Sequence, residues 1–213
     1  LKEDYPEIPG ILIVFDHVVS SNEKFKKTYL LHGVNAPEID GTRTVLKRTE
    51  FDYNGKLTND TLLPSANNVT ITQVAANENE YWAGNVNFES YGYASSLNEQ
   101  GGIRTEISPV TPSKEDYFLN VMQMSEPDVE PMEATLIETD THKGVKIADR
   151  IVLFGNTKEQ VDANVSFDFS ADGEYKITIT DLKPGTWNIT KDGADYGNVV
   201  VSEDGTLADF KGE

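Results

Sequence analysis

One of the three histidines ends a short apolar run and has the chemistry of a metal ligand. His32 closes Tyr29-Leu-Leu-His32, whose composition is that of a β-strand. A neutral imidazole at a strand end suits Zn²⁺, but a zinc site needs several such ligands. The alternative is a half-buried strand residue whose ring bonds a backbone carbonyl. On residue type alone, His32 is one candidate ligand and not a complete site.

The other two histidines are weaker candidates. Asp16 and His17 are neighbours on a predicted strand, so their side chains point to opposite faces and cannot bind one metal. We expect Asp16 to cap a turn or bond across strands, and His17 to be solvated. His142 lies within 139–144 (TDTHKG), which has the composition of a turn between strands, so its ring is expected to be exposed.

A basic cluster interrupts this acidic sequence at Lys24, Lys26 and Lys27. Together with Tyr29 these side chains could contact an anionic glycan, and Lys26 is the candidate substrate-binding residue among them. The alternative is a solvated turn. Both interpretations place the cluster at the surface.

Arg104 and Glu106 are two residues apart on a predicted strand and therefore share one face, while Ile103, Thr105 and Ile107 share the other. This alternation is typical of a strand with one solvated face. An exposed Arg–Glu pair contributes little to stability, and we do not expect Arg104 to bind a saccharide.

Aromatic residues gather in one stretch, at Tyr81, Trp82, Tyr91 and Tyr93. Aromatic rings stack on sugar rings, so this stretch favours carbohydrate contact, with Trp82 as the candidate binding residue. Core packing is the alternative for at least half of these side chains. No P-loop, dinucleotide fingerprint, nucleophile elbow or Cys/His zinc cluster accompanies them, and no catalytic residue is predicted in the chain.

Charge limits the partners that this chain can bind. The 18 Lys and Arg residues face 36 Asp and Glu residues, which gives a formal net charge of -18. Such a field repels nucleic acid, so a nucleic-acid partner is not expected. A sulfated or uronic-acid ligand would need a local basic patch or a metal. The longest apolar run, Ile11 to Phe15, is too short to span a membrane, and the N-terminal residues have no targeting pattern.

Short strand-like runs separated by turn signals carry these candidate residues and predict an all-β fold, an antiparallel sandwich. The apolar run within 10–19 is typical of a strand buried in the middle of a sandwich. Asn54-Gly55 predicts a hairpin between 42–53 and the residues after it. The remaining strands are expected at 27–32, 69–75, 81–88, 102–108, 117–124, 134–138, 144–154, 174–180, 186–190 and 197–202.

The sequence pattern changes near Gly155. Long predicted strands with bulky aromatic residues precede it, and short strands with alternating apolar and polar residues follow. We therefore expect a main β-sandwich over 1–158 and a small antiparallel sheet over 159–213, separate or packed on the sandwich. Residues Leu207 to Phe210 would begin a strand without a partner, and the opening residues lead straight into a strand, so both ends are expected to be truncations.

Four segments in order resemble the C-terminal region of heparinase II and related lyases of the heparinase II/III group. They are 14–32 (VFDHVVSSNEKFKKTYLLH), 54–64 (NGKLTNDTLLP), 102–109 (GIRTEISP) with 116–123 (DYFLNVMQ), and 181–187 (DLKPGTW). Their order and spacing span most of the chain. The resemblance implies an α/α-toroid followed by β-sandwich domains in the parent enzyme, which cleaves uronic-acid-containing, heparin-like polysaccharide by β-elimination.

The same resemblance assigns roles within the parent. Its catalytic residues come largely from the toroid and the start of the central β domain, so this chain alone is expected to be inactive and supporting. His32 is similar to one ligand of a structural zinc held by two histidines and an aspartate, and the other two ligands are expected upstream of Leu1. A secreted or periplasmic bacterial protein is implied. The alternatives are a carbohydrate-binding module and a purely structural β-sandwich of a surface protein.

Overall fold

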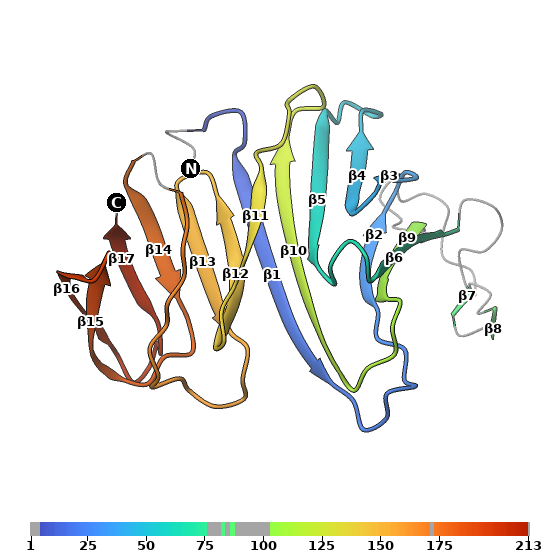
Figure 1. Ribbon diagram of the computed structural model, residues 1–213. Coiled ribbons are helices and arrows are strands. Elements are labelled where there is room, and N and C mark those ends of the chain that lie inside the picture. The colour runs from blue at the N-terminus through green and yellow to red at the C-terminus, as the bar shows by residue number, and fades with distance from the viewer. Residues whose placement is uncertain (1–4, 76–81, 84–85, 88–102, 171–172, 213) are drawn as a thin grey trace. The chain divides into compact units, whose positions relative to one another are not determined.

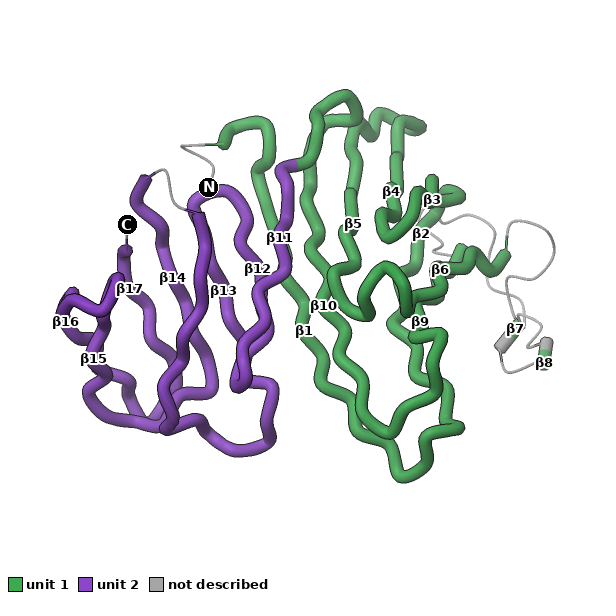
Figure 2. The backbone as a smooth tube through the Cα atoms, in the orientation of Figure 1, with its two compact units in different colours: residues 1–131 green, residues 132–213 purple. Residues whose placement is uncertain are grey.

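The computed structural model describes residues 5–75, 82–83, 86–87, 103–170 and 173–212, and every regular element in these ranges is a β-strand (Figure 1). The predicted all-β class is confirmed. Because the described part contains no helix, no helix there could cross a membrane. Contacts divide the chain into unit 1, Leu1–Pro131, and unit 2, Met132–Glu213 (Figure 2).

Unit 1 contains a five-stranded sheet and a three-stranded sheet. The larger has the order β1-β10-β5-β4-β3 and the smaller the order β2-β9-β6, all with antiparallel neighbours. Two short strands, β7 and β8, pair with each other. The bounds are β1 Gly10–Val19, β2 Tyr29–Gly33, β3 Glu38–Asp40, β4 Arg43–Arg48, β5 Gly55–Leu63, β6 Val69–Val74, β7 Trp82–Ala83, β8 Val86–Asn87, β9 Ile103–Pro109 and β10 Glu115–Ser125.

The two larger sheets of unit 1 pack through one face each. The ring of Tyr29 on β2 stacks on that of Phe118 on β10, with ring centroids 6.3 Å apart. Gly33 on β2 lies so close to Leu46 on β4 that an added Cβ would come within 2.8 Å of that side chain. Hydrophobic side chains from both sheets, including Ile107 and Phe118, are almost fully buried. The arrangement is the predicted antiparallel sandwich.

The strand at 10–19 has the predicted bounds but not the predicted position. β1 pairs with β10 and forms one end of its sheet among the described strands, and Leu12 is 52% exposed. The prediction of a central buried strand was wrong. An apolar run by itself does not determine whether either face of the strand is buried.

The predicted hairpin is present, but its turn lies elsewhere. β4 and β5 pair antiparallel with Arg48 opposite Gly55, so the connection is the longer loop 49–54. Phe51 and Asp52 take the left-handed backbone conformation, with φ of 55° and 65°. Asn54-Gly55 therefore leads into β5 and does not form the two-residue turn.

Unit 2 consists of one five-stranded sheet and a two-stranded ribbon. The sheet order is β11-β12-β13-β14-β17, with β13 and β14 parallel and the other neighbours antiparallel, and β15 pairs with β16 to form the ribbon. The bounds are β11 Ala134–Glu138, β12 His142–Ile147, β13 Arg150–Gly155, β14 Tyr175–Ile179, β15 Gly185–Lys191, β16 Ala194–Val201 and β17 Ala208–Gly212.

Unit 2 has a hydrophobic core of its own. The buried residues of this core all come from the sheet, the ribbon and their connections: Ile137, Ile151, Leu153, Val161, Tyr175, Ile177, Ile179, Leu182, Val201 and Ala208. The predicted boundary after residue 158 falls inside this unit, between β13 and β14, which pair with each other.

Two strand predictions in unit 2 were wrong. The run 144–154 is not one strand, because Ala148 takes a left-handed conformation with φ of 50° and a tight turn separates β12 from β13. The predicted unpaired strand after Leu207 has a partner, since β17 pairs antiparallel with β14 along its whole length. Both errors concern chain reversals and pairings that strand alternation does not encode.

Candidate functional site

The outer face of the β2-β9-β6 sheet carries most of the polar candidates. Residues directly opposite in the register share a face, and His32 lies opposite Arg104 while Leu30 lies opposite Glu106. Leu30 and His32 are exposed. We define the outer face by Leu30, His32, Thr70, Thr72, Val74, Arg104 and Glu106.

A chain of charged contacts crosses this outer face. Arg104 Nε donates to Glu106 Oε1 at 3.0 Å, and Lys26 Nζ donates to Glu106 Oε2 at 2.9 Å. These two cations lower the pKa of the Glu106 carboxyl, with the Lys26 hydrogen bond as the largest cause and burial acting in the opposite direction. Glu106 is therefore held as a carboxylate between two cations.

The Arg104–Glu106 pair was predicted and is present, but it is not solvated as expected. The two side chains are only 14% and 20% exposed. Arg104 also donates through its NH2 group to the backbone carbonyl of Trp82 at 2.6 Å. This pair is thus a partly buried structural centre of the outer face.

All three predicted site residues lie around this centre. His32 is opposite Arg104, Lys26 contacts Glu106, and Trp82 is bonded through its carbonyl to Arg104. The Trp82 side chain is 39% exposed. The sequence predicted these three residues separately. The signal that could have connected them was the strict alternation of 103–107, which places Arg104 and Glu106 on one face.

The other aromatic candidates are not placed. Tyr81, Tyr91 and Tyr93 lie outside the described residues. Of this aromatic stretch, Trp82 lies within the described residues.

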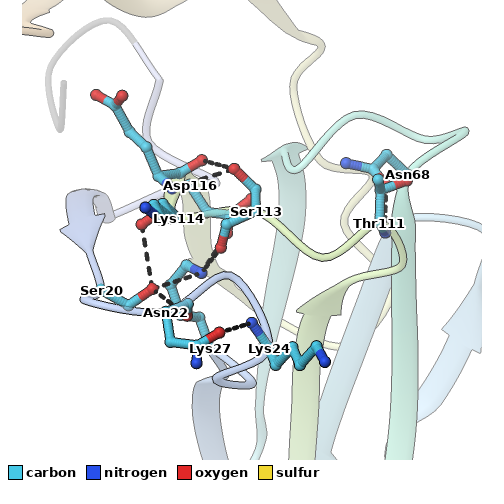
Figure 3. A network of polar contacts seen from close by, with 10 residues as sticks. Ser20, Asn22, Lys24, Lys27, Asn68, Thr111, Ser113, Lys114 and Asp116 are labelled. Atoms are coloured by element: carbon cyan, nitrogen blue, oxygen red, sulfur yellow. Dashed lines mark hydrogen bonds and ion pairs between the residues drawn. The ribbon is translucent and has the colours of Figure 1, made fainter.

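The loop that presents Lys26 is fixed by the polar network of Figure 3. Its central residue is Lys27, which is 8% exposed, pairs with Asp116 Oδ2 at 2.8 Å and donates to the carbonyl of Ser113. Ser20 bonds the carbonyl of Lys114 through its backbone N–H at 2.8 Å. The basic cluster thus splits, because Lys24 and Lys26 are exposed whereas Lys27 is a buried anchor.

The two remaining histidines contradict their predictions. The side chain of His17 is 15% exposed, bonds Glu115 at 2.7 Å and stacks on Tyr117 with ring centroids 4.6 Å apart, so it is not solvated. His142 is fully buried in β12, not exposed in a turn. His142 lies in a polar stretch of sequence and His17 beside Asp16, and contacts with distant segments bury both rings.

A zinc site requires several His, Cys, Asp or Glu donors close together. In the described part of the chain, no three His, Cys, Asp or Glu side chains are grouped so that they could hold a metal. His32 is exposed on the outer face. The described residues alone therefore do not form a zinc site, because one histidine is not a complete ligand set.

Comparison with known families connects this architecture to one enzyme group. No curated protein matches the chain. Residues 136–213, which begin in β11 and include the rest of unit 2, match the model of the heparinase II C-terminal domain. The resemblance of this chain to the C-terminal region of heparinase II is therefore confirmed for residues 136–213.

Proposed function

We propose that this chain is the C-terminal β portion of a heparinase II/III-like lyase that cleaves uronic-acid-containing, heparin-like polysaccharide by β-elimination. The observation that carries the proposal is the match of residues 136–213 to the heparinase II C-terminal domain. The ordered motifs in unit 1 extend the resemblance toward the N-terminus. The partners are the polysaccharide, an α/α-toroid and a central β segment of the parent.

The role of this portion is support, not catalysis. β-Elimination requires a group that neutralises the carboxylate at C5, a base for the C5 proton and an acid for the leaving oxygen. On the outer face, Arg104 and Lys26 are both paired with Glu106. A carboxylate held between two cations is a weak base, so this cluster suits positioning of the chain or of an anionic glycan.

Three residues have proposed roles on the outer face. His32 supplies one ligand of a structural zinc in the parent, and zinc there would fix the strand end to the segments that supply the other ligands. Lys26 and Trp82 contact the polysaccharide. We propose a secreted or periplasmic location, because the proposed substrate is a polysaccharide.

The direct test is a β-elimination assay that follows the absorbance of unsaturated uronate. The full-length parent should be active on a uronic-acid polysaccharide, whereas residues 1–213 alone should give no signal. Turnover by residues 1–213 would show that the catalytic set lies within them. A full-length parent that lacks lyase activity on uronic-acid polysaccharides would contradict the assignment.

Zinc is tested separately by metal analysis of the purified parent with and without His32→Ala. The expected result is loss of bound zinc in the variant and retention in a control with His17→Ala, since His17 pairs with Glu115. Equal zinc content in both variants would remove His32 from the ligand set.

A carbohydrate-binding module is the second candidate, and the partial exposure of Trp82 beside Arg104 favours it. In that case residues 1–213 would bind glycan through Trp82, and the full-length protein would have no lyase activity. Binding measurements on Trp82→Ala together with the lyase assay separate the two functions.

A further inference from the structure

A group of polar side chains lies inside the sandwich of unit 1, apart from the outer face. Thr44 on β4, Asn59 and Thr61 on β5, and Asn120 on β10 are each at most 2% exposed. We call these four residues the buried polar cluster. Burial of polar groups is costly unless each one is hydrogen-bonded, so the partners of every polar atom in the cluster matter.

The strand register places the buried polar cluster on one face of the five-stranded sheet. Thr44 lies opposite Asn59, and Thr61 lies opposite Asn120. Alternate residues of a strand share a face, so Asn120 points to the same side as Phe118, whose ring stacks on a ring of β2. The cluster therefore faces the β2-β9-β6 sheet, in the interior of the sandwich.

Hydrogen bonds inside the buried polar cluster form one small network. Asn59 Nδ2 donates to Asn120 Oδ1 at 3.2 Å and to Thr61 Oγ1 at 3.3 Å. The Thr61 hydroxyl donates to Asn120 Oδ1 at 2.8 Å. Three other buried atoms of the cluster have no hydrogen-bond partner among the described residues: Thr44 Oγ1, Asn59 Oδ1 and Asn120 Nδ2.

The unpaired atoms do not depend on the orientation chosen for the two amides. If both amide groups were turned over, the same network would form with donor and acceptor exchanged, and Asn59 Nδ2 and Asn120 Oδ1 would be unpaired. In either orientation, one amide donor and one amide acceptor lack a partner. The hydroxyl of Thr44 also lacks one.

This unpaired set restricts the kind of ligand that could complete the buried polar cluster. A cation cannot accept a bond from the unpaired amide N–H, and an anion cannot donate to the unpaired carbonyl oxygen. The four side chains of the cluster are neutral and offer an ion no counter-charge. A water molecule both donates and accepts, so it can pair all three atoms at once.

The β5–β10 ladder is irregular beside the cluster. Leu119 lies opposite Leu63 whereas Asn120 lies opposite Thr61, so Leu62 has no residue opposite it. Such a bulge interrupts the ladder and bends the strand. A bridging molecule at the cluster would connect the strands at the point where their ladder is broken.

We propose that an ordered water molecule binds inside unit 1 and bridges Thr44, Asn59 and Asn120. The water donates to the Asn59 carbonyl and to the Thr44 hydroxyl and accepts from the Asn120 amide, which joins β4, β5 and β10. It provides partners for three atoms that folding has removed from solvent. The site lies within unit 1 and does not depend on whether the parent is a lyase.

The sign of a stability change tests this site. Thr44→Val replaces the hydroxyl with a methyl group of similar size. With the water bound, the change removes a hydrogen bond and should lower the folding equilibrium constant of unit 1 about fivefold. Without it, the change removes an unpaired buried hydroxyl and raises that constant. Amide hydrogen exchange at 57–61 of β5, measured on residues 1–213, reports the constant for this unit.

Two other threonines calibrate the measurement. Thr61→Val removes a hydroxyl that donates to Asn120, so it should lower the protection of 57–61 about fivefold with or without the water. Thr72 is exposed on the outer face, and Thr72→Val should change the protection less than about twofold. Protection in Thr44→Val that equals or exceeds that of the unchanged chain overturns the proposal.

A measurement on the unchanged chain covers the case in which a variant fails to fold. A buried water tumbles with the protein, so the side-chain amide protons of Asn59 and Asn120 in isotope-labelled residues 1–213 should show nuclear Overhauser effects to water with the sign of a long-lived complex. The exposed amide of Asn67 is the control and should show none of that sign. Absence of the effect at both Asn59 and Asn120 overturns the proposal.

Discussion

His142 is fully buried in β12 with both ring nitrogens bonded. The carbonyl of Thr180 can only accept, so Nε2 carries the proton, and Nδ1 then accepts from the hydroxyl of Thr141, with distances of 2.9 and 3.0 Å. This neutral tautomer satisfies every polar atom of the ring. Burial lowers the pKa of His142, while the Thr180 bond and the charge of Asp181 oppose that shift.

The lowered pKa gives unit 2 a pH-dependent stability. Because the unfolded state binds the proton more readily, the stabilisation is fully present above about pH 6.5 and is lost as pH falls through the folded pKa. We expect the free energy of unfolding to fall by at most about 1.4 kcal/mol per pH unit from this group. Denaturant titrations at several pH values should show this slope, and it should disappear in His142→Gln. An unchanged slope in the variant would assign it to other groups.

Gly144 is required at its position by backbone crowding. A Cβ there would lie 1.9 Å from the carbonyl oxygen of Val152 and 2.8 Å from the Cα of Leu153 on the paired strand. Gly144→Ala should lower the free energy of unfolding by about 3 kcal/mol or more, because neither backbone atom can move without breaking the β12–β13 ladder. Gly173→Ala is the control, since its Cβ meets nothing within 4 Å. Equal stability of the two variants would contradict the crowding.

At the scale of elements, the ion pair of Lys27 and Asp116 joins the loop before β2 to the start of β10. Both residues are 8% exposed, and the Lys27 ammonium pairs with Asp116 and also donates to Ser20 and to the carbonyl of Ser113. A buried pair is costly to break from one side.

Removal of one partner should therefore lower the free energy of unfolding more than removal of both partners. We expect Lys27→Met to lower the free energy of unfolding by about 3 kcal/mol, and Lys27→Met combined with Asp116→Leu to recover part of that loss. A double-mutant cycle measured by chemical denaturation checks this. The exposed pair Lys47–Glu38 serves as the control, with an effect below about 1 kcal/mol. Additive effects of the two buried substitutions would show that the charges are not coupled.

At the scale of the whole molecule, the two units divide between Pro131 and Met132. The core of unit 2 contains residues Ile151 and Leu153 of β13, and β13 pairs in parallel with β14. A segment that starts after residue 158 lacks this strand and its buried side chains.

Fragment boundaries test this division. Residues 132–213 should fold on their own, with dispersed amide proton signals and a cooperative thermal transition, because the core and its sheet are complete. Residues 159–213 should not fold, because β14 loses its parallel partner β13 and the core loses three buried residues, Ile137, Ile151 and Leu153. Cooperative folding of residues 159–213 would instead support the boundary after residue 158 that the sequence pattern predicts.

Much of the local structure was determined by the sequence alone. Strand runs at 10–19 and 134–138 were predicted with the observed bounds, since alternation and turn residues are properties of neighbouring positions. The hairpin before Gly55 and the shared face of Arg104 and Glu106 followed from the same local rules. The resemblance to the heparinase II C-terminal region was also visible, because ordered motifs persist in sequence.

Only the tertiary structure decided which of these elements meet. The gathering of His32, Lys26 and Trp82 around Arg104 and Glu106 depends on contacts between residues 22 to 80 positions apart, and no local pattern specifies such a partner. Burial of Lys27 and His142 likewise depends on distant groups that compensate their polarity. Composition predicts a surface for such residues, and a compensating partner in the fold allows the interior.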